Sequence, residues 1–317
     1  MLQEIQSPIL NELNEINKII AEYTESDIPT LQKIKHYCIH QPGRKQIRPS
    51  IILLAAGALG EIDTNTRHIA AVIEMIHIAT LLHDDVIDCA LTRRSEPTIN
   101  SKFTNSASIL MGDFVFACAF KIIANIHQKD LTQLISNATI KIIEGELFQL
   151  GLVGNSMTTI KNYNYIIDAK TACLFATGLQ AIGLSNSKYA SALKTLGWHL
   201  GMAYQIQDDL LDLDVKNMNL NKEHGKDLQE QKMTLPTIIA RRDGNASQQK
   251  IIDQIMKKTT PWQEVIPILE STGAIEKTQA IVSAHIKNTQ KALTLLPENN
   301  YSQALATLTT CLPKRKN

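Results

Sequence analysis

The chain has 317 residues, of which 44% are hydrophobic, and its 32 basic and 31 acidic side chains give a formal net charge of +1. A nucleic-acid-binding surface would show a basic excess, so this balance argues against a nucleic-acid partner. A chain of this length can bury a large core, and no low-complexity linker divides it. We therefore predict one domain over residues 1–317.

The cysteines and the N-terminal segment bear on the compartment. Five cysteines are scattered without a C-x-x-C pair, a pattern typical of reduced thiols rather than of disulfides or a zinc site. The segment MLQEIQSPILNELNEINK has acidic and polar residues where a signal peptide needs an apolar core. The longest uncharged apolar stretch, SIILLAAGALG, is too short to span a bilayer. We expect a cytoplasmic protein without a transmembrane segment.

Helical periodicity dominates the chain from its N-terminal part onward. Across residues 66–87, apolar side chains recur at intervals of three and four residues, and strict alternation is rare throughout. No proline lies between Pro97 and Pro236, so no proline interrupts the helices of the middle section. The predicted fold class is all-α, a single large helical bundle. Breaks are predicted at residues 41–43, 94–105, 151–156 and 216–231.

Two motifs of the form D-D-x-x-D stand inside apolar runs. The first comprises Asp84, Asp85 and Asp88, and the second comprises Asp208, Asp209 and Asp212. Either motif alone reads equally well as a solvated acidic helix end, but carboxylates in apolar surroundings usually pair with or coordinate something. Two motifs with the same spacing indicate a cation shared between two facing helices. Because His and Cys ligands are missing at metal spacing, the motifs favour magnesium with substrate phosphates over zinc.

Basic residues accompany both motifs along the sequence, and guanidinium and ammonium groups suit phosphate oxygens. Singly each is an ordinary surface charge, but their grouping points to a diphosphate ligand. His77 lies two helical turns before Asp84 on nearly the same face, where a ligand contact and a core position are equally good interpretations. Gln205 lies one turn before Asp208 and can donate to the same anion. The basic candidates are Lys45, Arg48, Arg93, Arg94, Lys170, Lys222 and Lys232.

These blocks resemble the trans-isoprenyl diphosphate synthases (the polyprenyl synthetase family), and the long-chain octaprenyl diphosphate synthases most of all. The resemblance runs from about Gly43 to Pro236 and includes GRKQIRP, LLHDDVIDCALTRRSEPTIN, MGDF, EGELFQL, the Lys170-Thr171 pair, QIQDDLLD and HGKDLQEQKMTLP in the family's order. It implies a homodimer of all-α subunits, each bundle enclosing a central cavity. It also implies condensation of isopentenyl diphosphate with an allylic diphosphate, such as farnesyl diphosphate, to a long all-trans product.

The resemblance implies a role for each candidate. Three magnesium ions would be held against the allylic diphosphate by Asp84, Asp88 and Asp208, supported by Asp85, Asp209 and Asp212. The substrate-binding set would include Thr171. The allylic diphosphate would be contacted by Arg93, Lys170, Gln205, Lys222 and Lys232, and isopentenyl diphosphate by Lys45, Arg48, His77 and Arg94. The catalytic candidates are Asp84, Asp88, Arg93, Lys170, Asp208 and Lys232.

Product length depends on the residues beneath the first motif. Ala79 and Thr80 lie about one turn before Asp84, where short-chain relatives usually have aromatic side chains, so an octaprenyl product is the best match. Product growth has alternative limits deeper along its path, at Met75, Ile76 or Phe148. Four departures from the family pattern put rate and affinity in doubt: Gln46 for Arg, Ser95 for Gly, and Asn221 and Gln231 for Gly.

Three other functions stay open: a shorter-chain (geranylgeranyl or farnesyl) diphosphate synthase, a class I terpene cyclase, and a non-catalytic regulatory subunit. In a cyclase the second metal motif normally mixes Asn, Ser or Thr with Glu, and regulatory subunits generally lose Asp ligands. Both motifs are intact here, which disfavours the cyclase and the regulatory subunit. A transient membrane contact for product release is also left open.

Overall fold

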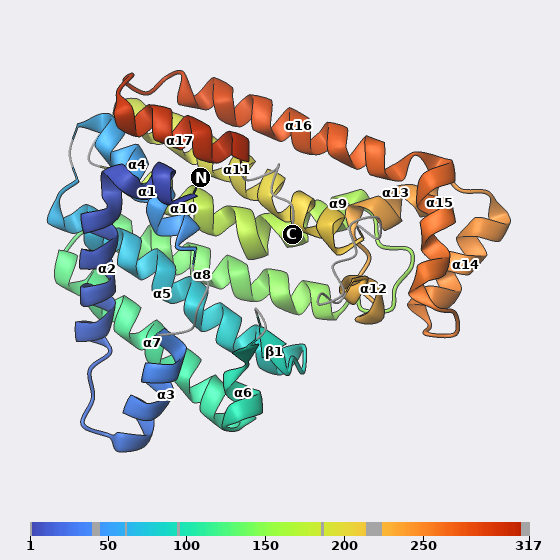
Figure 1. The fold of residues 1–317 in the computed structure, drawn as a ribbon, viewed down its shortest axis with the longest axis horizontal. Helices are drawn as coiled ribbons and strands as arrows, with labels where there is room; N and C mark the ends of the chain where they lie inside the picture. Colours follow the sequence, from blue (N-terminus) through green and yellow to red (C-terminus); the bar gives the residue numbers. More distant parts are fainter. Residues whose placement is uncertain are drawn as a thin grey trace. The chain divides into compact units, whose positions relative to one another are not determined.

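The computed structural model describes residues 2–39, 45–60, 62–93, 96–184, 187–213 and 224–311. The chain forms two compact units: unit 1 comprises residues 1–136, 178–190 and 296–305, and unit 2 comprises residues 137–177, 191–295 and 306–317. Helices make up almost all regular structure of the described residues (Figure 1), which confirms the all-α prediction. One domain over the whole chain stays a prediction.

Unit 1 is built around α5 (Thr64–Ile87), the helix that leads into the first Asp motif (Figure 1). The side chain of Asp63 accepts the Thr66 N–H and caps the helix at its N-terminus. The helix packs against α2 (Leu10–Tyr23), α4 (Ile47–Leu59) and α7 (Asn105–Ile126). The predicted helical stretch over residues 66–87 is confirmed, and its packing places the end of α5 firmly within unit 1.

The shorter elements of unit 1 include one departure from the predicted pattern. Residues 94–105 were expected to break the helices, and the described part of this stretch, residues 96–105, holds the short elements β2 (Glu96–Pro97) and α6 (Ile99–Lys102) before α7 begins. The strands are antiparallel, with Thr92 opposite Pro97. Two-residue strands are too short for alternation to reveal them. The predicted break at residues 41–43 lies outside the described residues. The short elements are α1 (Leu2–Gln6), η1 (Ser7–Ile9), α3 (Pro29–Ile39), β1 (Thr92–Arg93), β2 (Glu96–Pro97) and α6 (Ile99–Lys102).

Helix α7 is long and apolar enough to cross a membrane when judged by length and composition alone. In this structure it is a core helix of unit 1, because Met111, Val115, Ala119 and Ile122 are buried and the helix packs along α5. Buried core helices pass the same hydropathy test, so the sequence of α7 does not by itself identify a membrane span. The expectation that the chain has no transmembrane segment stays a prediction.

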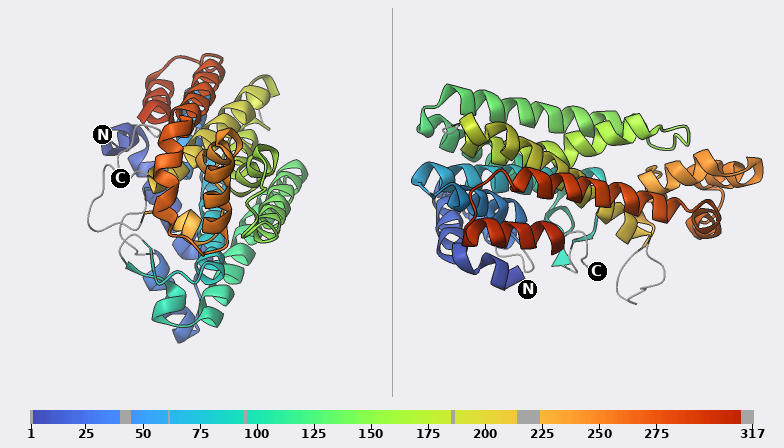
Figure 2. Two further views of the ribbon diagram at one scale, coloured as in Figure 1. Left: turned by 90° about the vertical axis from the view of Figure 1, so that its right-hand side faces the viewer. Right: turned by 90° about the horizontal axis from the view of Figure 1, so that it is seen from above.

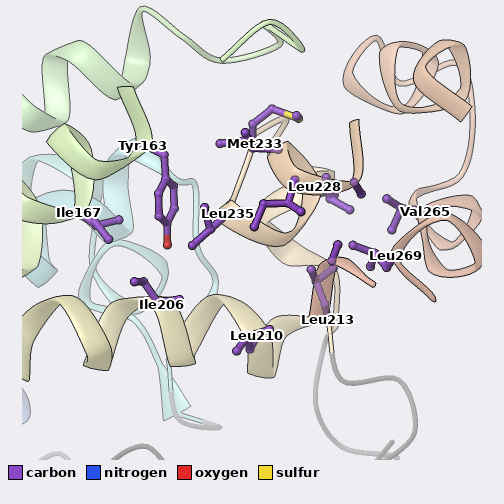
Figure 3. Packing of buried hydrophobic residues seen from close by; sticks show 14 of the residues in the cluster. Tyr163, Ile167, Ile206, Leu210, Leu213, Leu228, Met233, Leu235, Val265 and Leu269 are labelled. Carbon is purple, nitrogen blue, oxygen red and sulfur yellow. The ribbon is translucent and has the colours of Figure 1, made fainter. Parts of the chain in front are cut away.

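Unit 2 holds most of α11 (Ser187–Asp212), the helix that ends in the second Asp motif. A hydrophobic cluster surrounds its last turns. In Figure 3, Ile206 lies opposite Tyr163, whereas Leu210 and Leu213 lie nearer Leu228 and Leu269. Figure 2 shows α14, η4 and α15 gathered at the N-terminal end of α16. These elements are α9 (Ile160–Ile167), α12 (Lys226–Gln229), α13 (Leu235–Asp243), α14 (Ala246–Met256), η4 (Trp262–Val265), α15 (Ile266–Thr272) and α16 (Ala274–Leu293).

The segment that carries Lys170 and Thr171 is not α-helical. Between α9 and α10 (Cys173–Gly183) the chain forms a π-helical turn, η2 (Asp168–Ala172). Glycines on both neighbouring helices admit it. A Cβ at Gly145 of α8 (Lys129–Leu150) would lie 2.4 Å from the Cβ of Ala169, and a Cβ at Gly201 of α11 would lie 2.5 Å from the Cα of Ala172. The remaining helix is α17 (Asn300–Cys311). Single π-helical turns inside helices often mark functional sites.

Candidate functional site

The first Asp motif lies at the C-terminal end of α5. Asp84 and Asp85 belong to the last turn, and Asp88 is the C-cap residue. Asp85 is only 5% exposed, and its Oδ1 accepts a hydrogen bond from Arg93 Nε at 2.8 Å and forms an ion pair with Nη2 of the same side chain at 2.7 Å. Asp84 and Asp88 are half-buried. The structure therefore joins two predicted site residues directly, because the Asp85 carboxylate holds the Arg93 guanidinium beside the motif.

Two polar side chains that the sequence did not single out hold this end of α5 in place. Asn100 Nδ2 donates to the carbonyl oxygens of Asp85 and Ala90, at 3.2 and 3.0 Å. Thr98 is fully buried, and its hydroxyl donates to the Ala90 carbonyl at 2.8 Å. The Asp85 carbonyl also accepts the Ala90 N–H at 2.9 Å, so the side chains of Asn100 and Thr98 add to a backbone bond that already closes this end of the helix. They fix the backbone that directly follows Asp88.

The second Asp motif lies at the C-terminal end of α11, and its middle residue is the most enclosed. Asp209 is 4% exposed and accepts hydrogen bonds from the Tyr163 hydroxyl at 2.5 Å and from Gln205 Nε2 at 2.9 Å. Burial raises the pKa of Asp209 to about 7, although both hydrogen bonds act in the opposite direction. The neighbouring charges of Asp208 and Asp212 raise it further. A cation at this motif would favour the ionised carboxylate.

Asp212 is held by the backbone that begins α12. Its Oδ1 accepts the Lys226 N–H at 3.0 Å, and its Oδ2 accepts the Asp227 N–H at 3.1 Å. Burial raises the pKa of Asp212, opposed by these two backbone bonds, and burial also raises the pKa of Asp227 well above its ordinary value. A carboxylate offers about four lone-pair positions. The Asp212 carboxylate is thus fixed in orientation while both oxygens keep acceptor capacity.

The predicted polar site residues of unit 2 take part in two groups of contacts. Thr171 Oγ1 donates to Gln205 Oε1 at 2.8 Å, and Gln205 in turn donates to Asp209, so three predicted site residues share one chain of hydrogen bonds. Lys170 Nζ lies 2.5 Å from Glu146 Oε2 and 2.6 Å from Gln149 Oε1. Neither Glu146 nor Gln149 was a predicted site residue, although both belong to the EGELFQL block.

Lys232 lies at the start of the segment that leads into α13. Its ammonium lies 2.7 Å from Glu230 Oε2, and its side chain is 12% exposed. Glu230 is also 3.4 Å from the Lys226 ammonium, so this carboxylate lies between two cations. The Lys232 N–H donates to the Asp227 carbonyl at 2.7 Å, which ties Lys232 to α12 and so to the segment that holds Asp212.

The remaining candidates of unit 1 lie on α4 and α5. Lys45 is exposed just before α4, and Arg48 is half-buried in the first turn of that helix. His77 is half-buried on α5, and its carbonyl accepts the Thr80 hydroxyl at 2.9 Å. Ala79 is fully buried. The roles predicted for these five residues stay predictions.

Two of the four departures from the family pattern have a clear local structure. Gln46 and Gln231 both adopt positive φ, at 46° and 59°. Gln46 Nε2 donates to Asn17 Oδ1 at 2.9 Å, and Gln231 Nε2 donates to the Met256 carbonyl at 2.6 Å. Positive φ favours glycine, which agrees with the glycine usually found at the position of Gln231. Outside the described residues lie Arg94, Ser95, Asn221 and Lys222.

The donor chemistry of the motifs fits magnesium. Within the described part of either unit, no three His, Cys, Asp or Glu side chains form a group that could hold a metal ion by themselves. Magnesium is usually held by one or two carboxylates together with substrate phosphates. The all-oxygen donors of the two motifs suit an ion shared with a diphosphate. The first motif belongs to unit 1 and the second to unit 2, so their meeting at one site stays a prediction.

Comparisons with known proteins point to the same family as the sequence motifs described above. The family described as Polyprenyl synthetase matches residues 28–270. The chain is 35% identical to the octaprenyl diphosphate synthase of Haemophilus influenzae over 313 residues, covering 97% of this chain and 95% of that one.

Solved structures give the same picture. A decaprenyl diphosphate synthase from Rhodobacter capsulatus superposes with a TM-score of 0.93 at 29% identity, covering 99% of both chains. A polyprenyl synthase from Caulobacter crescentus CB15, complexed with calcium and isoprenyl diphosphate, has a TM-score of 0.91 at 27% identity, covering 100% of this chain and 98% of that one.

Proposed function

We propose a starter and a product for this protein, which belongs to the polyprenyl synthetase family and is a long-chain trans-prenyltransferase. It condenses isopentenyl diphosphate with farnesyl diphosphate, and it repeats the 1'-4 addition until octaprenyl diphosphate is formed. The observation that carries this proposal is the small, fully buried side chain of Ala79, five residues before Asp84 on α5. A small residue there leaves room for a growing chain. The identity to an octaprenyl diphosphate synthase supports the same length.

The two Asp motifs converge on one diphosphate in this proposal. Asp84, Asp88 and Asp208 would hold three magnesium ions, and Asp85, Asp209 and Asp212 would orient the motifs through their hydrogen bonds. Bound magnesium would neutralise the charge that builds on the departing diphosphate. The calcium and isoprenyl diphosphate bound to the polyprenyl synthase from Caulobacter crescentus support a metal–diphosphate pairing in the family.

The cationic side chains stabilise the same charge. Arg93, Lys170 and Lys232 donate to oxygens of the allylic diphosphate as its bond to the allylic carbon breaks, because donors aimed at developing charge lower the barrier most. Lys45, Arg48 and His77 hold the diphosphate of isopentenyl diphosphate, whose double bond attacks the allylic cation. The released diphosphate takes up the last proton. Apolar side chains keep water from the cation.

The protein acts as a homodimer in the cytoplasm, with a transient membrane contact when the product leaves. Exposed apolar side chains support a subunit interface. On α7, Ile109 and Leu110 are 42% and 66% exposed, and on α8, Ile140, Ile143 and Leu147 are 54%, 51% and 64% exposed. The three α8 residues recur at intervals of three and four and so share one helix face, and an exposed apolar face is typical of protein–protein interfaces.

The proposal is tested by incubating the purified protein with magnesium, labelled isopentenyl diphosphate and farnesyl diphosphate, followed by sizing of the products. A major product of eight isoprene units is expected, and no product is expected from D84A/D208A. Arrest at four units would identify a geranylgeranyl diphosphate synthase, whereas a farnesyl diphosphate synthase would add nothing to farnesyl diphosphate but would elongate a shorter allylic diphosphate to three units. A cyclic hydrocarbon formed from farnesyl diphosphate alone would identify a cyclase, and no incorporation at all would favour a regulatory subunit.

A further inference from the structure

The segment that holds Asp212 begins at a glycine in a left-handed conformation. Gly225 has φ of 68°, and its N–H donates to the Asp212 carbonyl at 2.8 Å. The next two amides, of Lys226 and Asp227, donate to the two Asp212 carboxylate oxygens. Three consecutive N–H groups therefore converge on one residue. Their aim depends on the backbone of Gly225, because left-handed φ is the conformation that turns the chain back onto the end of α11.

The indole of Trp262 lies directly against this glycine. A Cβ added at Gly225 would meet Cδ2 and Cε2 of Trp262 at 2.3 Å and Cε3 at 2.6 Å. Any other residue at position 225 would thus collide with the ring. The indole contact and the hydrogen bond to the Asp212 carbonyl together locate Gly225. Trp262 is therefore the side chain that supports the start of α12.

The indole is itself held by the hydrophobic cluster of unit 2. Trp262 packs against this cluster, which contains Leu228 of α12, Val265 of η4 and Leu269 of α15. Figure 3 shows Leu228 and Val265 together in this cluster, above Leu269 and Leu213. Trp262 and Leu228 also line a pocket of about 660 Å³ with Ile255. Removing the indole would enlarge this pocket and would take away the three atoms that lie nearest to a Cβ built at Gly225.

We propose that Trp262 is a positioning residue for the second Asp motif, acting through Gly225 and the first amides of α12 on the carboxylate of Asp212. The proposal rests on the proposed function in one respect only, namely that Asp212 supports metal binding. The contacts between Trp262, Gly225 and Asp212 are independent of the reaction. The proposal assigns Trp262 no contact with substrate or metal.

The first test measures hydrogen exchange of the backbone amides at residues 225–227 in the protein without ligands. W262A is expected to accelerate exchange there by roughly tenfold, the factor that corresponds to about 1.4 kcal/mol. W262F keeps an aromatic face on Gly225 and is expected to restore most of the protection. The matched control is I255A, which removes a buried side chain from the same pocket, whereas the three atoms nearest to a Cβ at Gly225 all belong to Trp262. Equal acceleration in W262A and I255A would overturn the proposal.

A second variant guards against misfolding of W262A. G225A introduces the clash with the indole and also strains the left-handed backbone at this position, so it is expected to lose at least as much protection as W262A. In the double variant G225A/W262A the clash is absent, and the two effects are expected to be less than additive. Full additivity would mean that the two residues act independently, which contradicts the proposal.

The third measurement tests whether the positioning of Asp212 by Trp262 affects magnesium binding. With inorganic pyrophosphate as the probe, the magnesium concentration for half-maximal binding is expected to rise several-fold in W262A and to return in W262F. An unchanged magnesium requirement together with fast exchange would limit Trp262 to a structural role and overturn its link to Asp212. If the wild-type protein fails to make a prenyl product, the proposed function falls, while the exchange experiment still tests the positioning contact.

Discussion

The hydroxyl of Tyr163 on α9 donates a 2.5 Å hydrogen bond to Asp209 of α11 in the interior of unit 2. Burial raises the pKa of both groups, that of Tyr163 well above its ordinary value and that of Asp209 to about 7. A phenol that stays protonated is a dependable donor to a carboxylate. Tyr163 and Gln205 therefore favour the ionised form of Asp209 against the effect of burial, and they fix the direction in which the second motif faces.

Replacing Tyr163 by Phe removes one of the two hydrogen bonds that lower the pKa of Asp209. The pKa of Asp209 should then rise further above about 7, by roughly one unit, since a hydrogen bond to a charged group contributes about 1.5–3 kcal/mol. More of the carboxylate is protonated at neutral pH, so the acid limb of the pH–activity profile should move to higher pH. The profile of kcat at fixed magnesium measures this shift.

The control for this variant is Y165F on the same helix, because Tyr165 is 40% exposed and packs edge-on against Phe148. Y165F should keep the wild-type acid limb. If Y163F and Y165F have the same acid limb, the hydrogen bond to Asp209 does not govern the titration that matters for activity.

Lys170 offers a test of the cationic side of the site. Its ammonium is held by Glu146 and Gln149 on α8, so it is already oriented before a diphosphate arrives. K170A should lower kcat by about 10²–10³-fold, the usual effect of removing one donor to a developing anion. K161A on α9 is the control, since Lys161 is exposed. A similar kcat for K170A and K161A would remove Lys170 from the catalytic group.

Local sequence patterns predicted the helices well and their contacts poorly. The helix over residues 66–87 was predictable because one periodic apolar face runs its whole length, and α5 occupies that stretch. The block that contains Lys170 was predictable from the motif, but the π-helical turn there was not. That turn depends on Gly145 and Gly201 of two other helices, and no local periodicity encodes such a pairing.

The supporting residues of the site escaped prediction for the same reason. Tyr163 is 46 residues from Asp209 in sequence, and Asn100 is 15 residues from Asp85. Neither belongs to a charged cluster or a spaced motif that would single it out. One signal did point to Asn100, namely its place in the block with the first motif, where a polar side chain follows a predicted helix end.

The size of residue 79 provides a test of product length. A79F places an aromatic ring on a fully buried position of α5, one turn before Asp84. We expect the main product to shorten by several isoprene units, because the ring fills the path of the growing chain. Product sizing by thin-layer or liquid chromatography measures the change. A79S, which adds only one oxygen, is expected to keep the wild-type product. An unchanged product in A79F would refute the proposal that the size of residue 79 limits product length.

The two histidines between α11 and α16 give a stability test that is independent of catalysis. Nδ1 of His199 and Nδ1 of His285 are 2.9 Å apart, and the indole of Trp198 lies beside both rings. Burial lowers the pKa of His199, and burial with the neighbouring imidazole lowers the pKa of His285 to about 4. The unfolded chain, with an ordinary His pKa of about 6.5, takes up protons first as the pH falls. The free energy of unfolding should therefore fall between about pH 6.5 and pH 4.

For His285 this loss is on the order of 2 kcal/mol, because each pKa unit corresponds to about 1.4 kcal/mol and the ring is only partly buried. Asp209 acts in the opposite direction, since its raised pKa makes stability fall as the pH rises toward about 7.

Comparing variants separates the contribution of His285 from that of Asp209. In urea unfolding at pH 5 and pH 7, H285Q should lose less stability on acidification than the wild type does. H127N, which changes an exposed histidine at the end of α7, should behave like the wild type. Equal acid sensitivity of H285Q and H127N would show that the buried imidazole pair does not control this part of the pH dependence.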